Sequence, residues 1–232
     1  MSPLAAIDLD PYWFPCDGPL LGVPHGANVL TNLPFLILGL WGLLRVWRAG
    51  PPVGADSNRV GLWTSVLLLA FGSGAYHLLL TPATLAADRA CISGILAFTV
   101  AEVLAAVWPG SRRPAVTLSL LAATELSVVL WCLGATSLIY GALQALGSLV
   151  LPVLAFRAWR AGRMPGSALR SLVLFIALYA LAKVAEALDA AVCSWTGFLG
   201  GHPLKHLLAA AALAALLPWL GRSVRASPAP RT

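Results

Sequence analysis

The sequence predicts an all-α membrane protein, a seven-transmembrane helix bundle with its N-terminus outside and its C-terminus in the cytoplasm. Of its 232 residues, 59% are hydrophobic and only 10% are charged, and the mean hydropathy is +0.84. An average soluble domain is about 45–50% apolar and about 25% charged. So few charges cannot cover a water-facing surface, and so apolar a chain is not intrinsically disordered.

Seven apolar runs supply the seven predicted helices. Each run is close to the roughly 20 residues that cross the hydrocarbon core of a bilayer. In chain order they are residues 28–44, 60–80, 88–108, 115–133, 137–156, 168–188 and 202–220.

Glycine and proline stand between most of these runs, because both residues interrupt helices. Pro34 and Pro152 fall inside runs, which membrane helices tolerate. The predicted organisation is an outer N-terminal segment at 1–27, a transmembrane domain at 28–220 and a cytoplasmic tail at 221–232. The breakers between runs are, in order, 49–52, Pro109 with Gly110, Gly134, Gly162 with Pro165, and Gly200 with Gly201.

The basic residues orient the bundle. The net charge of +6 would suggest nucleic-acid binding in a soluble protein. Here the arginines lie between apolar runs, as topology requires, so we expect no nucleic-acid partner. Twelve of the fifteen basic residues lie on one side of the predicted bundle, and Arg89, Lys183 and Lys205 lie on the other side. By the positive-inside rule, the side with the twelve is cytoplasmic. The twelve are Arg45, Arg48, Arg59, Arg112, Arg113, Arg157, Arg160, Arg163, Arg170, Arg222, Arg225 and Arg231.

All four histidines fall on the predicted outer side, and three of them match a metal-ligand pattern. His202 and His206 are spaced i, i+4, so their imidazoles share one helix face at the start of the last run. His77, near the outer end of the second run, is the third ligand of a catalytic zinc site with water in the fourth position. Two histidines facing lipid headgroups are the alternative explanation of the His202–His206 pair. Lys205 is expected to point away from their face.

Ser73 and Asp88 are expected at the same depth as these histidines. Ser73 precedes His77 by four residues, so its hydroxyl lies on the histidine's face and can contact the ligand or the substrate. The alternative is a serine that bonds back to a carbonyl of its own helix. Asp88 opens the third run and is a carboxylate partner for a reacting water, a helix N-cap, or both.

Glu186 and Asp189 close the sixth run and lie with Lys183 on one helical stripe. We expect this stripe to brace the site, with Glu186 or Asp189 orienting a zinc histidine. A simple Lys183–Glu186 ion pair is the equally weighted alternative. Glu102 and Glu125 lie within the third and fourth runs. We expect their carboxyl groups to be protonated or paired inside the bundle, and we assign them no catalytic role.

Cys16 and Cys193 are predicted to form a disulfide. Four cysteines without a CxxC spacing exclude a disulfide scaffold and a thiolate zinc site. Cys16 and Cys193 both fall on the outer side, where an oxidising compartment favours a bridge. That bridge would tie the N-terminal segment to the end of the sixth run.

The order and spacing of these candidate site residues resemble the sequence pattern of a known family. The spacings Ser73-x3-His77 and His202-x3-His206, with Asp88 between them, are similar to the pattern of the CREST superfamily of membrane hydrolases. That superfamily includes the alkaline ceramidases and the adiponectin and progestin receptors. The nearer resemblance is to the alkaline ceramidase family, specifically its small bacterial ceramidase-like members. Further similar strings are Cys16-Asp17, NVLTNLPF at 28–35, GSGAYHL, ADR and GHPLKHLLAA.

The resemblance implies a zinc-dependent amidase, and makes 28–220 a hydrolase domain. Its reaction would split the N-acyl amide of a ceramide-like sphingolipid into a fatty acid and a sphingoid base. His77, His202 and His206 would hold the zinc ion. Asp88 would hold and deprotonate the attacking water, and Ser73 would support the site or the oxyanion.

Calcium is the second metal that the resemblance raises, since eukaryotic members carry an acidic calcium-binding segment near the N-terminus. Asp17 keeps one acidic residue there, but His25 stands near the position where another is expected. Calcium needs several oxygen ligands. The sequence therefore departs from the family where calcium would bind.

The resemblance also sets the expected partner and location. The partner is a membrane lipid, ceramide or another N-acyl lipid, and no obligate protein partner is evident. The expected location is the bacterial inner membrane, with the site towards the outer face. A seven-helix lipid receptor or binding protein with little or no hydrolase activity is the alternative. A haem held by two histidines is disfavoured, because His202 and His206 share one helix face.

Overall fold

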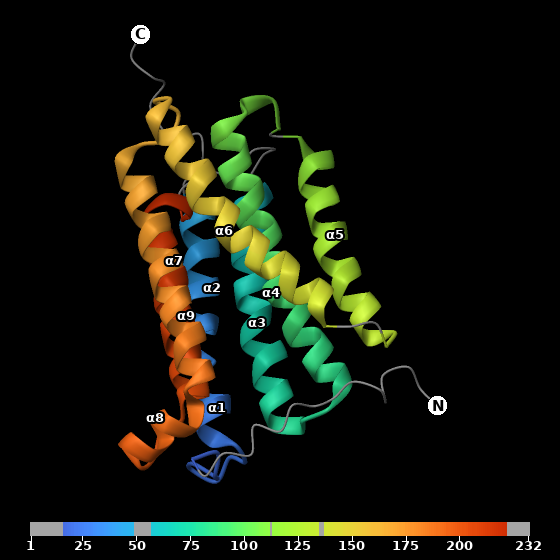
Figure 1. Ribbon diagram of the computed structural model, residues 1–232, viewed down its shortest axis with the longest axis vertical. Coiled ribbons are helices and arrows are strands. Elements are labelled where there is room, and N and C mark those ends of the chain that lie inside the picture. The colour runs from blue at the N-terminus through green and yellow to red at the C-terminus, as the bar shows by residue number, and fades with distance from the viewer. Residues whose placement is uncertain (1–15, 49–56, 112, 135–136, 222–232) are drawn as a thin grey trace.

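The described part of the chain is almost entirely helical (Figure 1). The computed structural model describes residues 16–48, 57–111, 113–134 and 137–221. Within these ranges the one β interaction is an isolated bridge between Leu20 and Val23. The predicted all-α membrane protein with seven transmembrane helices is confirmed, and the orientation of its termini stays a prediction. Most of the predicted outer segment and cytoplasmic tail lies outside the described residues.

In the part of the chain that the structure describes, seven helical stretches are long and apolar enough to cross a membrane, and they correspond one by one to the predicted runs. The first combines α1 and α2, which only Thr31 and Asn32 separate. The short helix α8 was not predicted. The helices are α1 (Gly26–Leu30), α2 (Leu33–Arg48), α3 (Ser57–Leu79), α4 (Pro82–Val107), α5 (Pro114–Cys132), α6 (Leu138–Arg160), α7 (Gly166–Ala187), α8 (Asp189–Thr196) and α9 (Gly201–Leu220), with a 3-10 turn at Pro109–Ser111.

The helix α4 begins six residues before the predicted start of its run. Thr81 caps it by accepting the backbone N–H of Thr84, and Pro82 occupies the first turn, where its missing N–H costs nothing. Asp88 therefore lies in the second turn and is buried, so the alternative that it caps the helix is wrong. Hydropathy missed this start because the threonines and alanines of the first turns are only weakly apolar.

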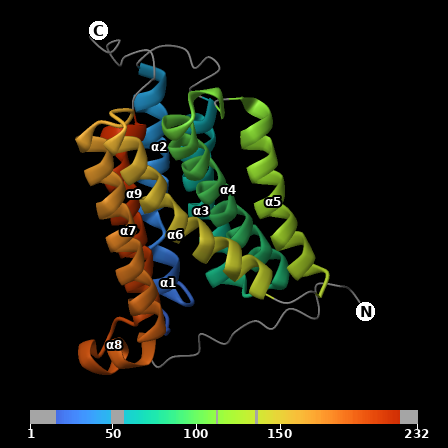
Figure 2. The ribbon, with the colours of Figure 1, turned by 45° about the horizontal axis from the view of Figure 1, so that its top comes forward.

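The helices pack so that the start of α9 lies against the end of α7. These two helices run side by side in both ribbon views, while α3 packs against α2 and α4, and α4 also contacts α5 and α6 (Figures 1 and 2). A Cβ on Gly201 would collide with the carbonyl oxygen of Ala185 in α7. Only glycine permits this approach, which sets the position of His202 in the next residue.

The apolar core contains fully buried side chains such as Trp63 and Leu216. The indole N–H of Trp63 donates to the carbonyl oxygen of Leu220 at 3.0 Å, so its polar atom is satisfied. Arg59, expected in the connection after the first run, instead lies buried in the first turn of α3. Its Nε is 3.2 Å from Oε2 of Glu102. The guanidinium thereby compensates the negative charge of the buried Glu102 carboxylate in α4.

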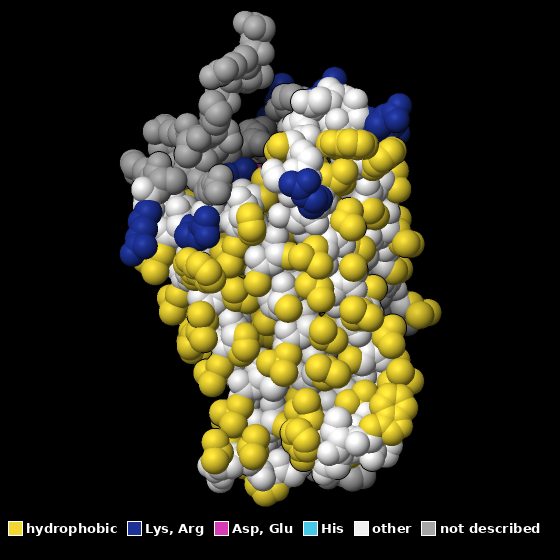
Figure 3. All heavy atoms as spheres, turned by 90° about the vertical axis from the view of Figure 1, so that its left-hand side faces the viewer, with side chains coloured by type: hydrophobic (Ala, Val, Ile, Leu, Met, Phe, Trp, Pro, Cys, Tyr) yellow, Lys and Arg dark blue, Asp and Glu magenta, His cyan; other side chains and the backbone are white. Residues whose placement is uncertain are grey.

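Arginines at the ends of α2 and α6 lie at the opposite end of the bundle from the three clustered histidines. Arg48 ends α2 and Arg160 ends α6. On the face shown in Figure 3, hydrophobic side chains cover the length of the molecule and the Lys and Arg side chains gather at one end. His77 lies in the last turn of α3, and His202 and His206 lie in the first turns of α9, at the other end.

Candidate metal centre

Three buried histidines from two helices form a cluster that can hold a metal ion. His77 comes from α3, and His202 and His206 come from α9. Each of the three offers one ring nitrogen, and these nitrogens lie within 4.8 Å of one another. The Nε2 atoms of His77 and His202 are 3.2 Å apart. Two nitrogens on a tetrahedral ion with bonds of about 2.0–2.1 Å stand roughly 3.3 Å apart, so this pair is spaced as two ligands of one such ion would be.

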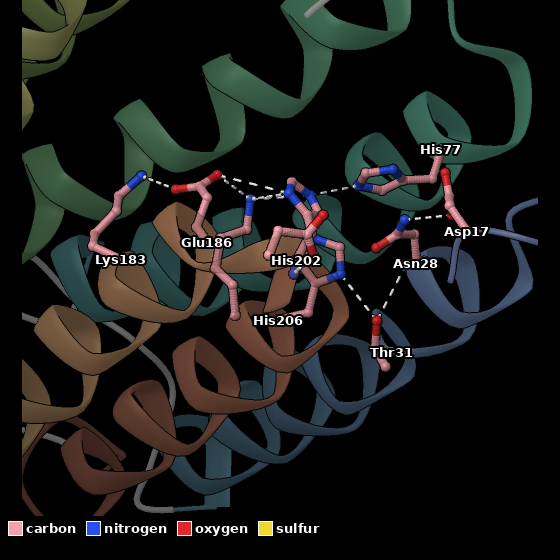
Figure 4. A network of polar contacts seen from close by, with 10 residues as sticks. Asp17, Asn28, Thr31, His77, Lys183, Glu186, His202 and His206 are labelled. Carbon is pink, nitrogen blue, oxygen red and sulfur yellow. Dashed lines mark hydrogen bonds and ion pairs between the residues drawn. The ribbon is translucent and has the colours of Figure 1, made fainter. Parts of the chain in front are cut away.

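Thr31, between α1 and α2, orients the ring of His206 (Figure 4). Its hydroxyl donates to the carbonyl oxygen of Ala27 at 2.7 Å, so its oxygen is left to accept from Nδ1 of His206 at 3.0 Å. This contact places the proton on Nδ1 and leaves the Nε2 lone pair for a metal ion. The sequence alone does not indicate this role of Thr31, because a single threonine carries no pattern of its own.

We expect Thr31→Val to weaken zinc binding about 10- to 100-fold, because ring-orienting partners of metal-bound histidines contribute that much. Valine keeps the shape of threonine and removes only the hydroxyl. The matched control is Thr99→Val, since the Thr99 hydroxyl bonds to the carbonyl oxygen of Ile95 in its own helix. Competition with a fluorescent zinc chelator measures both affinities. Equal affinities for the two variants would contradict the role of Thr31.

Asp189 holds the backbone at the start of α9. Its Oδ1 accepts the backbone N–H of His202 at 2.6 Å. Burial raises the pKa of Asp189, and the hydrogen bonds from the backbone N–H groups of His202 and Gly201 oppose that rise. Asp189 therefore acts on the main chain of His202, one of the two histidines of α9, and its role in orienting a metal-binding histidine stays a prediction. The residue also opens α8 rather than closing the sixth span.

Glu186 bridges two lysines instead of pairing with Lys183 alone (Figure 4). Its Oε2 is 2.8 Å from Nζ of Lys183, and its Oε1 is 2.7 Å from Nζ of Lys205. Its Oε1 is 3.8 Å from Nδ1 of His202, which is beyond hydrogen-bonding distance. Glu186 therefore contacts the histidine mainly through Lys205.

Lys205 folds back towards the metal-binding face, so the expectation that it points away from that face is wrong. Its Nζ lies 3.1 Å from Nε2 of His202. The sequence spacing of three residues places the two on neighbouring positions of one helix, and the long lysine side chain covers the remaining distance. The same Nζ lies 3.4 Å from Nδ1 of His202, so Lys205 faces both nitrogens of that ring.

A cavity of about 90 Å³ opens beside the histidine cluster, and the predicted catalytic residues line it. Ser73 lies one turn before His77 on α3, and Asp88 faces the same cavity from α4. In the part of the chain that the structure describes, no hydrogen bond or ion pair engages the Asp88 carboxylate. The rest of the wall is mainly apolar and includes Phe35, Leu69, Ile92, Ile95, Phe175 and Leu213.

No protein-family model, curated protein or solved structure matches the chain. The resemblance to the alkaline ceramidases therefore stays an expectation from the sequence motif. The structure brings the five residues of that motif to one cavity: Ser73, His77, Asp88, His202 and His206.

In the described part of the N-terminal segment, from residue 16 on, the oxygen ligands that calcium needs are not gathered. Within the described residues, Asp17 supplies the carboxylate there, and it accepts from Nδ1 of His25 at 2.8 Å and from Nδ2 of Asn28 at 2.6 Å. Burial raises the pKa of Asp17, and His25 and Asn28 oppose that rise. Both carboxylate oxygens thus already face N–H donors, and calcium requires six to eight oxygens. We derive no step through calcium.

A disulfide between Cys16 and Cys193 ties this segment to α8, with the two Cα atoms 5.7 Å apart. We expect Cys16→Ser to lower the free energy of unfolding by about 2–4 kcal/mol, because a bridge across a long loop restricts the unfolded chain. Thermal unfolding in detergent with and without reductant measures the effect. Cys91→Ser is the control, since Cys91 is free. Unfolding of the wild-type protein that ignores reductant would contradict a stabilising bridge.

Proposed function

We propose that the chain is a zinc-dependent intramembrane lipid amidase that hydrolyses an N-acyl amide to a fatty acid and an amine. The observation that carries the proposal is the placement of three buried histidines and an unengaged carboxylate, Asp88, on one mainly apolar cavity. Burial favours the neutral imidazole, which is the form that binds metal. Zinc held by three histidines supplies a Lewis acid for the carbonyl oxygen and lowers the pKa of water towards 7.

Asp88 is the proposed general base and acid. An ionised carboxylate only accepts hydrogen bonds, so it takes a proton from the attacking water as the water oxygen bonds to the carbonyl carbon. When the carbon–nitrogen bond breaks, Asp88 returns that proton to the leaving nitrogen. The net change adds one water across the amide, and Asp88 ends in its starting state.

Ser73 is the proposed hydrogen-bond donor to the carbonyl oxygen as negative charge develops on it. Its hydroxyl lies on the His77 face of α3 and lines the cavity. A donor fixed at that position stabilises the oxyanion without reorganising at the moment of reaction. No other role in the proposed reaction is assigned to the Ser73 hydroxyl.

The apolar wall supports a lipid as substrate. Side chains such as Phe35, Leu69 and Leu213 give the acyl chain a low-dielectric site next to the histidines. A water-soluble amide would not need a reaction centre inside a membrane bundle. Ceramide-like sphingolipids and other N-acyl lipids are the substrate class, and the positive-inside rule supports an inner-membrane enzyme with its site towards the outer face.

The test is release of fatty acid from a panel of N-acyl lipids by the purified zinc-loaded protein in detergent micelles. The panel contains ceramides of several chain lengths, N-acylethanolamines and N-acyl amino acids. We expect at least one member to be hydrolysed in a reaction that a chelator stops and added zinc restores. A protein that binds zinc and these lipids yet hydrolyses none of them would instead be a lipid receptor or binding protein.

A further inference from the structure

The cavity beside the histidines is elongated along the bundle. Four helices each contribute a stripe of lining residues that begins near the histidines and runs about two turns towards the middle of the helix. Positions three or four residues apart share one helix face, so each stripe forms a continuous wall. The stripes end at Leu69 on α3, Ile95 on α4, Phe175 on α7 and Leu213 on α9.

Polar and apolar side chains of this wall are separated by depth. The histidines, Asp88 and Lys183 line the end at which the stripes begin, whereas the four residues at which they end are all apolar. A polar headgroup at the deep end would lose its hydration without gaining a hydrogen bond, which is costly. When the amide lies at the histidines, the acyl chain therefore points into the deep end and the amine side faces the polar end.

The walls reach the same depth on different helices. Leu69 stands eight residues from His77 on α3, and Leu213 stands seven residues from His206 on α9. On α4 the stripe ends seven residues after Asp88. With a rise of about 1.5 Å per residue, the cavity extends about 10–12 Å beyond the histidines.

Below this depth the bundle is solid. The next positions on the same faces, three residues further along α3, α7 and α9, are Val66, Leu172 and Leu216. All three are 0% exposed and belong to the packed core, and none of them lines the cavity. Protein interiors are close-packed, so a chain that goes deeper has to displace core side chains. The cavity therefore has a floor.

We propose that this floor limits the acyl chain of the substrate to about ten carbons. The inference rests on the proposed function and narrows its substrate class. An extended chain advances about 1.2 Å per single bond, as the span of about 3.3–3.6 Å for the three bonds of one residue shows. A depth of about 10–12 Å thus takes about eight to ten carbons. The palmitoyl chain of a long-chain ceramide is too long to lie in the cavity.

N-acylethanolamines that differ only in their saturated acyl chain test the limit: hexanoyl, octanoyl, decanoyl, dodecanoyl and palmitoyl. We expect kcat/KM to rise with length up to the octanoyl or decanoyl lipid, because each methylene buries more apolar surface. For the palmitoyl lipid it should fall at least about tenfold below the best chain, because overpacking a filled cavity is unfavourable. Rates are compared at equal mole fractions of lipid in detergent micelles.

Two substitutions change the cavity in opposite directions. Leu213→Ala removes part of the floor and should raise the ratio of dodecanoyl to octanoyl activity about tenfold, since the space left takes about two more methylenes. Ala209 lines the wall between His206 and the floor, so Ala209→Leu should lower the ratio of decanoyl to hexanoyl activity by a similar factor. Both ratios are taken relative to the wild type, which cancels differences in micelle partitioning.

Leu62→Ala is the matched control. Leu62 is a buried core leucine of α3 that does not line the cavity. Its truncation destabilises the bundle, as truncation of a core leucine does, but should leave the chain-length profile unchanged. Activity that rises all the way to the palmitoyl lipid, or one profile shared by the wild type and both cavity variants, would overturn the inference. A chain that leaves the cavity sideways between helices would give that result.

A binding measurement separates this inference from the proposed function. The thermal midpoint of the zinc-loaded protein rises with any ligand that binds the folded state. If no lipid is hydrolysed but the octanoyl or decanoyl lipid raises the midpoint most, and the dodecanoyl lipid does so in Leu213→Ala, the amidase proposal fails and the chain-length limit stands. If the rise grows with length up to the palmitoyl lipid, or no lipid raises the midpoint, the limit fails.

Discussion

The Asp88→Asn variant is expected to keep its zinc and to lose fatty-acid release by about 10²- to 10⁴-fold, the usual contribution of a general acid–base group. Asparagine has the same shape as aspartate but cannot accept the proton of the attacking water. Asp88 lies on α4, whereas α3 and α9 supply the histidines. Fatty-acid release under single-turnover conditions and zinc content by mass spectrometry measure the two properties.

Glu125→Gln is the matched control for this variant. Glu125 is a carboxyl side chain in the neighbouring helix α5 and is not part of the cavity wall. Its replacement should leave both activity and zinc unchanged. If Asp88→Asn retains full activity, Asp88 is not the proton carrier. If it loses zinc as well, Asp88 supports the metal site rather than the reaction.

His206→Ala should bring the zinc content from one ion per chain close to none. Three imidazoles and a water complete a four-coordinate site, and the loss of one imidazole leaves two protein ligands. Because His77, His202 and His206 are all buried and mutually close, His77→Ala should have the same effect. Zinc content after extensive dialysis is the measurement.

His25→Ala is the control for histidine loss. His25 lies in the N-terminal segment, where its ring bonds to Asp17, and it is not part of the metal-binding cluster. This variant should keep its zinc. If all three variants bind zinc as the wild type does, the ion occupies another site.

The sequence predicted the bundle and the histidine cluster for physical reasons that act locally. A span of about 20 apolar residues needs no tertiary information to be recognised. The i, i+4 spacing of His202 and His206 fixes their common face on any helix. The alternation of spans places the end of α3 and the start of α9 on the same side of the membrane. Helix packing then brings His77 next to His202.

Other features depended on packing that no local pattern contains. Thr31 contacts His206 only because the break between α1 and α2 lies against α9. The return of Lys205 towards His202 depends on Glu186, which comes from another helix. The position of Asp88 inside α4 was recoverable, since Thr81, Pro82 and Thr84 form a capping signal.

The most direct test of a zinc-dependent lipid amidase is a zinc titration of the metal-free protein with fatty-acid release as the readout. The substrate is the best lipid of the N-acyl panel. We expect the rate to rise in proportion to zinc and to stop rising at one ion per chain, because His77, His202 and His206 form one site. A rate that does not depend on zinc, or no fatty acid at any zinc ratio, would contradict it.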